Sequence, residues 1–226
     1  MGRLWSWLRE LRAFLLQMLA ADESPHCLPP LEKNKTVHVW PPSWPEFKGG
    51  ELEKIPAGLR EREEVYGQPN VSISTGNRFK VSRAFAKNLG TIPAHTFTQY
   101  SNRIYCHLLV HPYVKEAMRR AFEVCPLWRP RKIGCFNPRR MRHSKNPRVP
   151  LSDHTWAIAF DIDPKQNRAW SRKKHPDRPQ PFTENWSDFS DIPEGVILAW
   201  ESVGFEWGGR WKTFCDPMHF SLRKVK

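Results

Sequence analysis

Apolar residues recur every three or four positions in three segments of the chain, which is the spacing of one face of a helix. This pattern predicts a helix over residues 111–125, where Pro126 marks its end. A second helix is predicted over residues 193–203, because a proline opens the segment and Gly204 follows it. The first segment, residues 1–22, carries arginines beside an apolar face and predicts a basic amphipathic helix with Leu4, Leu8, Leu11, Leu15 and Leu19 on that face.

Apolar residues that alternate with small or polar ones predict short strands. The clearest pattern covers residues 156–162, where Asp161 falls on the face of the small residues and the large residues are Trp156, Ile158, Phe160 and Ile162. Shorter strands are predicted over residues 132–136 and 218–223. Together these elements predict an α+β domain in which helices pack on a small antiparallel sheet.

Prolines without any sustained period separate the first helix from the predicted domain. Residues 23–58 are therefore expected to form a linker or an extended arm, and residues 59–226 the folded domain. Residues 1–22 fit an export signal, a membrane-surface anchor or a helix that packs on the protein, and the pattern leaves these open. The basic, proline-containing residues 165–181 are expected to form a surface loop.

Composition supports a folded domain and adds a strong positive charge. Of the 226 residues, 39% are hydrophobic and 12% aromatic, which is enough apolar material for a core and excludes general disorder. Thirty-six Lys and Arg against 23 Asp and Glu leave a net charge of +13, which favours binding to polyanions. Five cysteines without a C-x-x-C pair indicate buried thiols, not a disulfide framework or a cysteine zinc site.

Two histidines have acidic residues at telling positions. His154 precedes the predicted strand that carries Asp161, and Asp216 lies three residues before His219. Two histidines and one carboxylate leave an open position on tetrahedral zinc, which is typical of catalytic sites. The remaining carboxylate, Asp216, is then the natural general base. From spacing alone, a surface histidine in a turn and a capping aspartate explain these residues equally well.

The segments SDHTWAIAFDID and GFEWGGRWKTFCDPMHF resemble the signatures of a family of zinc metallopeptidases. This family includes D-alanyl-D-alanine carboxypeptidases, D-alanyl-D-alanine dipeptidases and the L-alanyl-D-glutamate endopeptidases of phage endolysins. Its pattern, S-x-H-x-x-G-x-A-x-D followed by an acid, two residues and a histidine, is met except that Ala157 replaces the glycine. The resemblance implies that His154, Asp161 and His219 bind Zn²⁺ and that Asp216 is the catalytic base.

The resemblance also implies a cation upstream of the first histidine that holds substrate and stabilises the oxyanion. Arg139 best matches its position, with Arg140 and Arg142 as alternatives in register. Further candidates for substrate binding are Ser152, Trp207 and Trp211, although both tryptophans suit the core as well.

The spacing W-G-G-x-W followed by D-x-x-H-F resembles the endolysin branch, whereas carboxypeptidases usually carry Glu as the base. The implied function is hydrolysis of peptidoglycan stem peptides by an L-alanyl-D-glutamate endopeptidase, and the alternatives are a D-alanyl-D-alanine carboxypeptidase of cell-wall metabolism and a non-catalytic, zinc-retaining module. The implied partners are stem peptides and anionic cell-wall polymers, with possible membrane-surface contact through residues 1–22. The implied place of action is the bacterial envelope, for a protein encoded by a phage or prophage and made in the host cytoplasm.

A nucleic-acid-binding protein is supported by charge alone and by no recognition motif, so no nucleic acid partner is expected.

Overall fold

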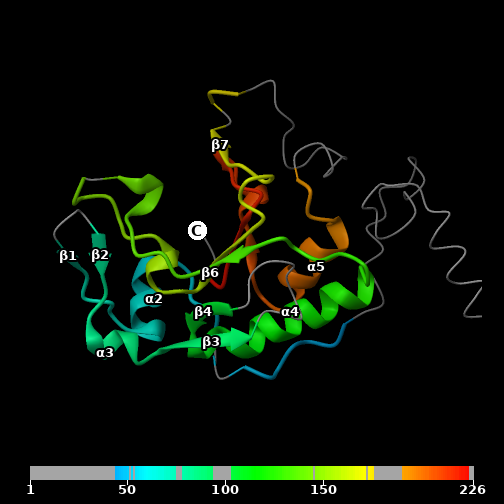
Figure 1. Cartoon of the computed structure of the whole chain (residues 1–226), viewed down its shortest axis with the longest axis horizontal. Coiled ribbons are helices and arrows are strands. Elements are labelled where there is room, and N and C mark those ends of the chain that lie inside the picture. The colour runs from blue at the N-terminus through cyan, green and yellow to red at the C-terminus, as the bar shows by residue number, and fades with distance from the viewer. Residues whose placement is uncertain are drawn as a thin grey trace, which may run out of the picture.

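The computed structural model describes residues 44–50, 52, 54–74, 78–93, 103–144, 146–171, 173–175 and 190–223. In this part of the chain, helices and short strands enclose a hydrophobic core (Figure 1). The predicted helix over residues 1–22, the first part of the predicted linker and the end of the predicted basic loop lie outside the described residues.

Two helices with strongly apolar faces form one side of the core. Helix α4 (His111–Val124) has a proline in its first turn, which needs no backbone donor there, and it buries residues at helical spacing: Val114, Ala117, Met118 and Ala121. Helix α5 (Glu194–Ser202) begins after Pro193 and packs along α4. Both helices confirm the sequence prediction to within about two residues.

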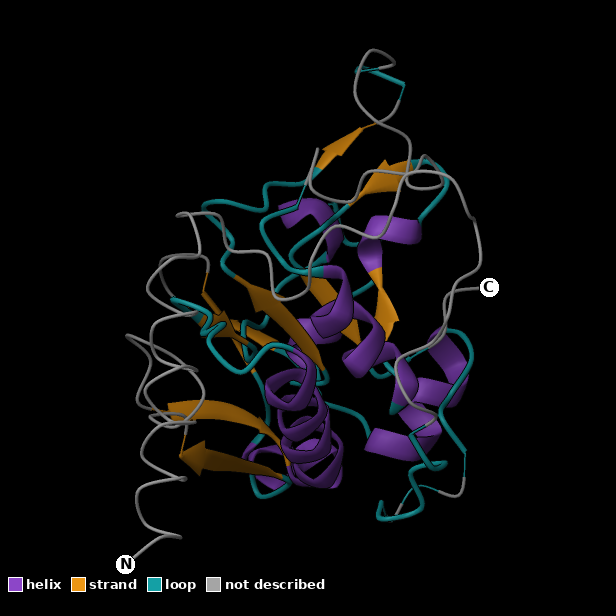
Figure 2. Ribbon diagram, turned by 90° about the vertical axis from the view of Figure 1, so that its right-hand side faces the viewer, coloured by secondary structure: helices purple, strands orange, loops and turns teal. Residues whose placement is uncertain are grey.

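A four-stranded antiparallel sheet packs against α5, and it appears beside the helices in Figure 2. Its strands run in the order β5 (Ile133–Gly134), β6 (Ala159–Ile162), β10 (His219–Ser221) and β8 (Glu206–Trp207). Aromatic rings join the two layers, because the ring centroids of Phe160 and Phe220 lie 5.6 and 5.1 Å from that of Trp200 on α5. Burying each such ring contributes roughly 1.5–3 kcal/mol.

The register of this sheet positions the site. Strands β6 and β10 pair so that His219 lies directly opposite Asp161. In an antiparallel pair, residues opposite each other project their side chains on the same face. Two residues that are far apart in the sequence therefore meet on one face of the sheet.

Shorter elements surround this centre. They are α2 (Leu59–Tyr66), β1 (Ser72–Ser74), β2 (Arg78–Lys80), α3 (Arg83–Ala86), β3 (Leu89–Pro93), β4 (Arg103–His107), β7 (Trp170–Ser171) and β9 (Phe214–Cys215). Strands β1 and β2, β3 and β4, and β7 and β9 form separate antiparallel pairs. Helices and small antiparallel sheets in one domain confirm the predicted α+β class. Among the described residues, none of the helices has the length and apolar character needed to cross a bilayer.

The described part of the proline-rich segment, residues 44–58, lies on the surface of the domain. Trp44 donates its indole N–H to Glu123 on α4 at 3.2 Å, and Arg120 on α4 donates to the carbonyl of Pro45 at 2.8 Å. Ile55 packs partly buried against the core.

The cysteines of the described residues are buried free thiols, as the sequence predicted: Cys106, Cys125, Cys135 and Cys215.

Candidate functional site

The chain makes a tight turn just before β6. Residues Asp153–Thr155 form one turn of 3-10 helix, and the hydroxyl of Ser152 caps it by accepting the His154 N–H at 3.4 Å. Ala157 then adopts a left-handed conformation with φ of 55°. Ser152 is only 5% exposed and its hydroxyl caps this turn, and its role in substrate binding stays a prediction.

Strand β6 begins at Ala159, not at Trp156 as the alternating pattern predicted. The apolar alternation extends through the turn because Trp156 and Ile158 are both buried in the core. The turn places His154 outside the strand. It thereby resolves the geometric problem that His154 and Asp161 would point to opposite faces of one straight strand.

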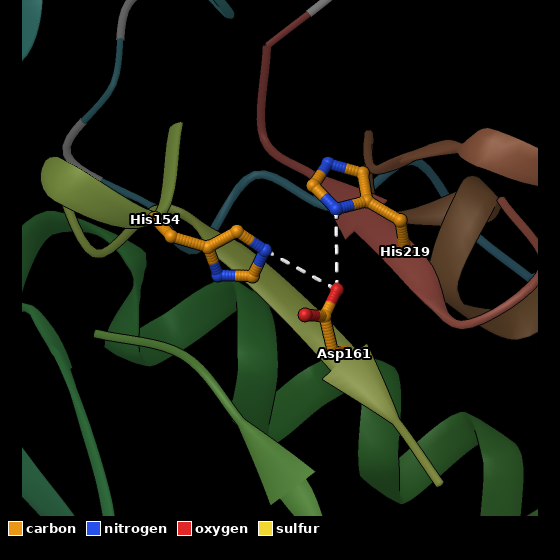
Figure 3. A group of neighbouring side chains, drawn as sticks. All are labelled: His154, Asp161 and His219. Atoms are coloured by element: carbon orange, nitrogen blue, oxygen red, sulfur yellow. Dashed lines mark hydrogen bonds and ion pairs between the residues drawn. The ribbon is translucent and has the colours of Figure 1, made fainter. Parts of the chain in front are cut away.

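Three side chains converge on one point with the spacing of a metal site. His154, Asp161 and His219 each offer a ligand atom, and these atoms all lie within 4.8 Å of one another. Figure 3 shows both imidazoles directed at the same carboxylate oxygen: Asp161 Oδ1 lies 3.2 Å from His154 Nε2 and 3.2 Å from His219 Nδ1. Ligand atoms of a tetrahedral zinc at about 2.1 Å are about 3.4 Å apart, so the group fits this ion.

The hydrogen bond made by Nδ1 of His154 shows which ring nitrogen carries a proton. Nδ1 lies 2.7 Å from the carbonyl oxygen of Cys135. A carbonyl can only accept a hydrogen bond, so Nδ1 carries a proton and Nε2 is the ring nitrogen left to face the centre of the group. Histidines that bind metals are typically oriented by such a contact. His154 Nε2 is buried and has no hydrogen-bond donor beside it among the described residues, which is the condition a metal would satisfy.

The electrostatics of the group favour an ionised carboxylate between two imidazoles. Burial opposes ionisation of Asp161, but hydrogen bonds and charge from the two histidines lower the pKa of its carboxyl. Burial likewise opposes the charged form of His219, yet the contacts with Asp161 and the charge of Asp216 raise the pKa of that imidazole. In the described structure the imidazoles thus favour the ionised form of Asp161, which is the form that binds a metal.

Asp216 lies beside this group without belonging to it. Burial raises the pKa of its carboxyl, and the charges of His219, Asp161 and His154 all act on it. Its Oδ1 is buried with no hydrogen-bond partner among the described residues. The backbone holds Asp216 tightly, because its N–H donates to the carbonyl of Gly208 at 3.0 Å.

Gly208 occupies a position that admits no side chain. A Cβ there would lie 2.7 Å from the Asp216 carbonyl oxygen, 3.1 Å from Asp216 Cβ and 3.2 Å from His219 Cβ. This glycine allows the chain of the W-G-G-x-W motif to pass directly against the acid and the second histidine. The sequence indicated a turn at Gly208, but its contact with the site could not be predicted.

Of the three arginines in register, Arg139 faces the acids. Both its N–H and its carbonyl bond the hydroxyl of Thr155, at 3.1 and 3.0 Å, and its carbonyl also accepts the Ser152 N–H at 2.8 Å. Burial lowers the pKa of its guanidinium, while the charges of Asp161, Asp216 and Asp153 act in the opposite direction. Its Nε is buried and has no hydrogen-bond partner among the described residues.

The two alternatives point elsewhere. The guanidinium of Arg140 donates to the carbonyl of Val149 at 2.7 Å. Arg142 places its guanidinium carbon 5.9 Å from the centre of the Phe214 ring. Neither arginine is among the groups that act most strongly on the carboxyls of Asp161 and Asp216.

The two candidate tryptophans differ in position. Trp207 has no exposed surface and donates its indole N–H to the carbonyl of Pro217 at 2.7 Å, so it lies in the core, and its role in substrate binding stays a prediction. Trp211 is partly exposed, its ring centroid lies 5.1 Å from that of His219, and its indole donates to Glu206. Trp211 therefore borders the metal group.

A buried acid and two buried arginines next to the site were not predicted. Asp153 forms ion pairs with Arg62 at 2.7 Å and with Arg223 at 2.8 Å. Although burial opposes its ionisation, these charges lower the pKa of Asp153 to about 2. Asp153 is thus unsuited to be a base. Only its position beside His154 signalled a role.

A buried group of two histidines and one carboxylate, with a second carboxylate beside it, defines a zinc hydrolase site with an open coordination position. Residues 145–222 match a family of zinc peptidases whose description is D-alanyl-D-alanine carboxypeptidase. The match confirms the resemblance found in the sequence: the protein is a zinc metallopeptidase that acts on peptidoglycan. No curated protein and no solved structure matches the chain.

Proposed function

We propose that the protein cleaves the bond between L-alanine and D-glutamate in the stem peptide of peptidoglycan. His154, Asp161 and His219 would hold a zinc ion, which would supply a Lewis acid to activate water and polarise the scissile carbonyl. The observation that carries the hydrolase site is the convergence of the three ligand atoms within 4.8 Å, where the inner strands β6 and β10 pair.

Asp216 and Arg139 perform the remaining chemistry. The unpartnered carboxylate oxygen of Asp216 takes the proton from water as it attacks the carbonyl. Arg139, held by Thr155 and directed toward the same acids, stabilises the negative charge that develops on the carbonyl oxygen. Trp211, whose ring centroid lies 5.1 Å from that of His219, contacts the bound peptide in this proposal.

The ligand assignment is tested by removing each histidine. His154→Ala and His219→Ala are expected to lose zinc and hydrolysis together, as measured by metal analysis of purified protein and by release of wall fragments. His175→Ala, a histidine outside the metal group, serves as the control and should retain both. Full zinc content in the two test variants would refute these ligands, whereas bound zinc without hydrolysis in the unaltered protein would favour a non-catalytic module.

The proposal of an endopeptidase rests on the packing of the W-G-G-x-W motif, residues 207–211, against the D-x-x-H-F motif, residues 216–220. Gly208 packs against Asp216 and His219 at distances that exclude a side chain, so the two motifs work as one unit in this chain. Their pairing resembles the endolysin branch. We further propose, from that resemblance, a phage or prophage origin and the bacterial envelope as the site of action.

A D-alanyl-D-alanine carboxypeptidase is the second candidate, because the matched family model carries that description. Arg139 could then bind the terminal carboxylate of the substrate. Mass spectrometry of digested stem peptides separates the two. New amino-terminal D-glutamate supports the endopeptidase, and free D-alanine from otherwise intact stems would replace it with the carboxypeptidase.

A basic cavity supports anionic cell-wall polymers as a further partner. The cavity measures about 590 Å³ and is lined by Arg142, Ser171, Lys173, Lys174, Lys212, Thr213 and Phe214. Four cations and no acid in this lining suit a polyanion. The double variant Lys173→Glu, Lys174→Glu should bind walls that carry such polymers more weakly than the unaltered protein, while both should bind polymer-stripped walls equally. Equal binding to both kinds of wall would remove this partner.

A further inference from the structure

A buried carboxylate joins the two chain segments that carry the histidines. Asp153 lies on the turn beside His154 and is 4% exposed. Its oxygens accept hydrogen bonds from the Ser221 hydroxyl at 3.1 Å and from Arg223 at 2.8–3.0 Å. Ser221 belongs to β10, the strand that begins with His219. The Asp153 side chain thus connects the turn that carries His154 with strand β10, which carries His219.

The third member of this network comes from a distant part of the chain. Arg62 on α2 is 1% exposed and donates to Asp153 at 2.7 Å and to the carbonyl of Leu151 at 3.2 Å. Its guanidinium carbon also lies 3.4 Å from the ring centre of Trp156. Arg62 therefore contacts the chain on both sides of the 3-10 turn, at Leu151 before it and at Trp156 after it.

Two arginines around one buried aspartate constrain geometry more strongly than a single pair. The planar guanidinium of Arg223 engages both carboxylate oxygens, which fixes the orientation of the aspartate. Arg62 then fixes its position relative to α2. A shift of the turn would separate buried charges from their partners, and the low dielectric of the interior opposes this.

We propose that Asp153, together with Arg62 and Arg223, is a positioning residue that sets the distance between His154 and His219 and thereby the affinity for zinc. The inference rests on the proposed zinc ligands. It also makes α2, which lies outside the matched residues 145–222, a necessary part of the zinc site. The network touches neither ligand atom and acts only through the backbone that carries them.

The test compares matched arginine substitutions. Arg62→Lys keeps the charge but loses the planar fork, and it should weaken zinc binding about 10- to 100-fold, the usual effect of losing a contact behind a metal ligand. Arg120→Lys is the control, because Arg120 is equally buried at 2% and pairs with Glu116 on α4, away from the histidines. Zinc dissociation constants are measured by competition with a coloured chelator, and circular dichroism of the metal-free proteins confirms folding.

Asp153→Asn is a second, isosteric variant and should weaken zinc binding in the same way. Zinc affinity within threefold of the unaltered protein in Arg62→Lys and Asp153→Asn would overturn the proposal. An equal loss in Arg62→Lys and Arg120→Lys would overturn it too, because general destabilisation would then explain both. His154→Ala and His219→Ala separate failure of this proposal from failure of the proposed zinc ligands. If these two variants retain zinc, the ligand assignment is wrong. If they lose zinc while Arg62→Lys and Asp153→Asn retain it, only the positioning role of Asp153 is wrong.

Discussion

At the scale of single residues, Ala157 shows what replaces the glycine of the family pattern. It is fully buried, with φ of 55°, and its carbonyl accepts the His107 N–H at 2.9 Å. A left-handed conformation costs an L-residue about 1–2 kcal/mol, whereas a buried methyl group contributes about 0.8 kcal/mol. The departure from glycine was evident in the sequence, but the dihedral that explains the glycine was not.

We therefore expect opposite tolerance of smaller and larger side chains at this position. Ala157→Gly should change the free energy of unfolding by less than about 1 kcal/mol, because lost burial and relieved strain offset each other. Ala157→Val should lower it by about 2–4 kcal/mol, because a β-branched residue is strained at positive φ and overfills the core. Urea unfolding of the metal-free proteins measures both. A larger loss for glycine than for valine would contradict this account.

Asp216 should behave as a base and not as a ligand. Asp216→Asn is expected to retain zinc and fold while hydrolysis falls by about 10²- to 10⁴-fold, because a positioned proton acceptor contributes that much. Asp163→Asn provides a control: Asp163 lies in a left-handed conformation that asparagine tolerates, and its side-chain oxygen accepts the Lys132 N–H at 2.7 Å, as an amide oxygen can. Normal turnover by Asp216→Asn would assign the base elsewhere.

At the scale of elements, the ends of a helix or strand were predicted accurately where the apolar periodicity stopped at the end of that element. The period of α4 stops at Pro126, so its end was predicted closely. The alternation before β6 continues through a turn whose buried Trp156 has the same role in the core as a strand residue. Apolar periodicity reports burial, and here burial extended beyond the strand.

The junction between β4 and the following 3-10 turn predicts a pH dependence of stability. His107 is 3% exposed; its Nδ1 accepts the Leu109 N–H at 3.2 Å and its Nε2 lies 3.3 Å from the Tyr66 carbonyl. Burial, opposed by that carbonyl, lowers the pKa of His107 to about 4. A lowered histidine pKa stabilises the fold above the unfolded value of about 6.5, and this contribution is lost as the pH falls from there through about 4.

His107→Gln can keep both hydrogen bonds but cannot titrate, so it isolates this contribution. Between pH 7 and pH 4 the unaltered protein should lose about 3 kcal/mol more unfolding free energy than the variant. Urea titrations of the metal-free proteins at several pH values measure the difference, since zinc release is then excluded. Parallel pH profiles of the two proteins would show that His107 does not titrate in this way.

At the scale of the whole molecule, the sequence predicted which residues meet at the metal better than what supports them. His154, Asp161 and His219 sit in motifs with recognisable spacing. Arg62 was not predicted, because no local pattern distinguishes an arginine that reaches a partner 91 residues away from one that faces solvent. The β3–β4 hairpin was also missed, because exposed Tyr105 and Pro93 obscure its alternation.

Removal of residues 1–21 should leave hydrolysis of soluble wall fragments intact. The proposed ligands, base and oxyanion residue all lie beyond Pro138, and the supporting arginines lie at positions 62 and 223. Turnover of soluble fragments and circular dichroism measure the effect. An inactive or unfolded truncation would instead make this segment part of the catalytic domain, which we propose to span residues 59–226.

The most direct test of the account is digestion of purified peptidoglycan by the protein as isolated, after removal of metal by a chelator, and after return of zinc. The ligand set predicts that fragments appear with the isolated protein, disappear after chelation and reappear with about one equivalent of zinc per chain. Mass spectrometry of the released peptides provides the measurement, with His154→Ala as the inactive control. Undiminished release of the same peptides by the metal-free protein would contradict a zinc peptidase centred on His154, Asp161 and His219.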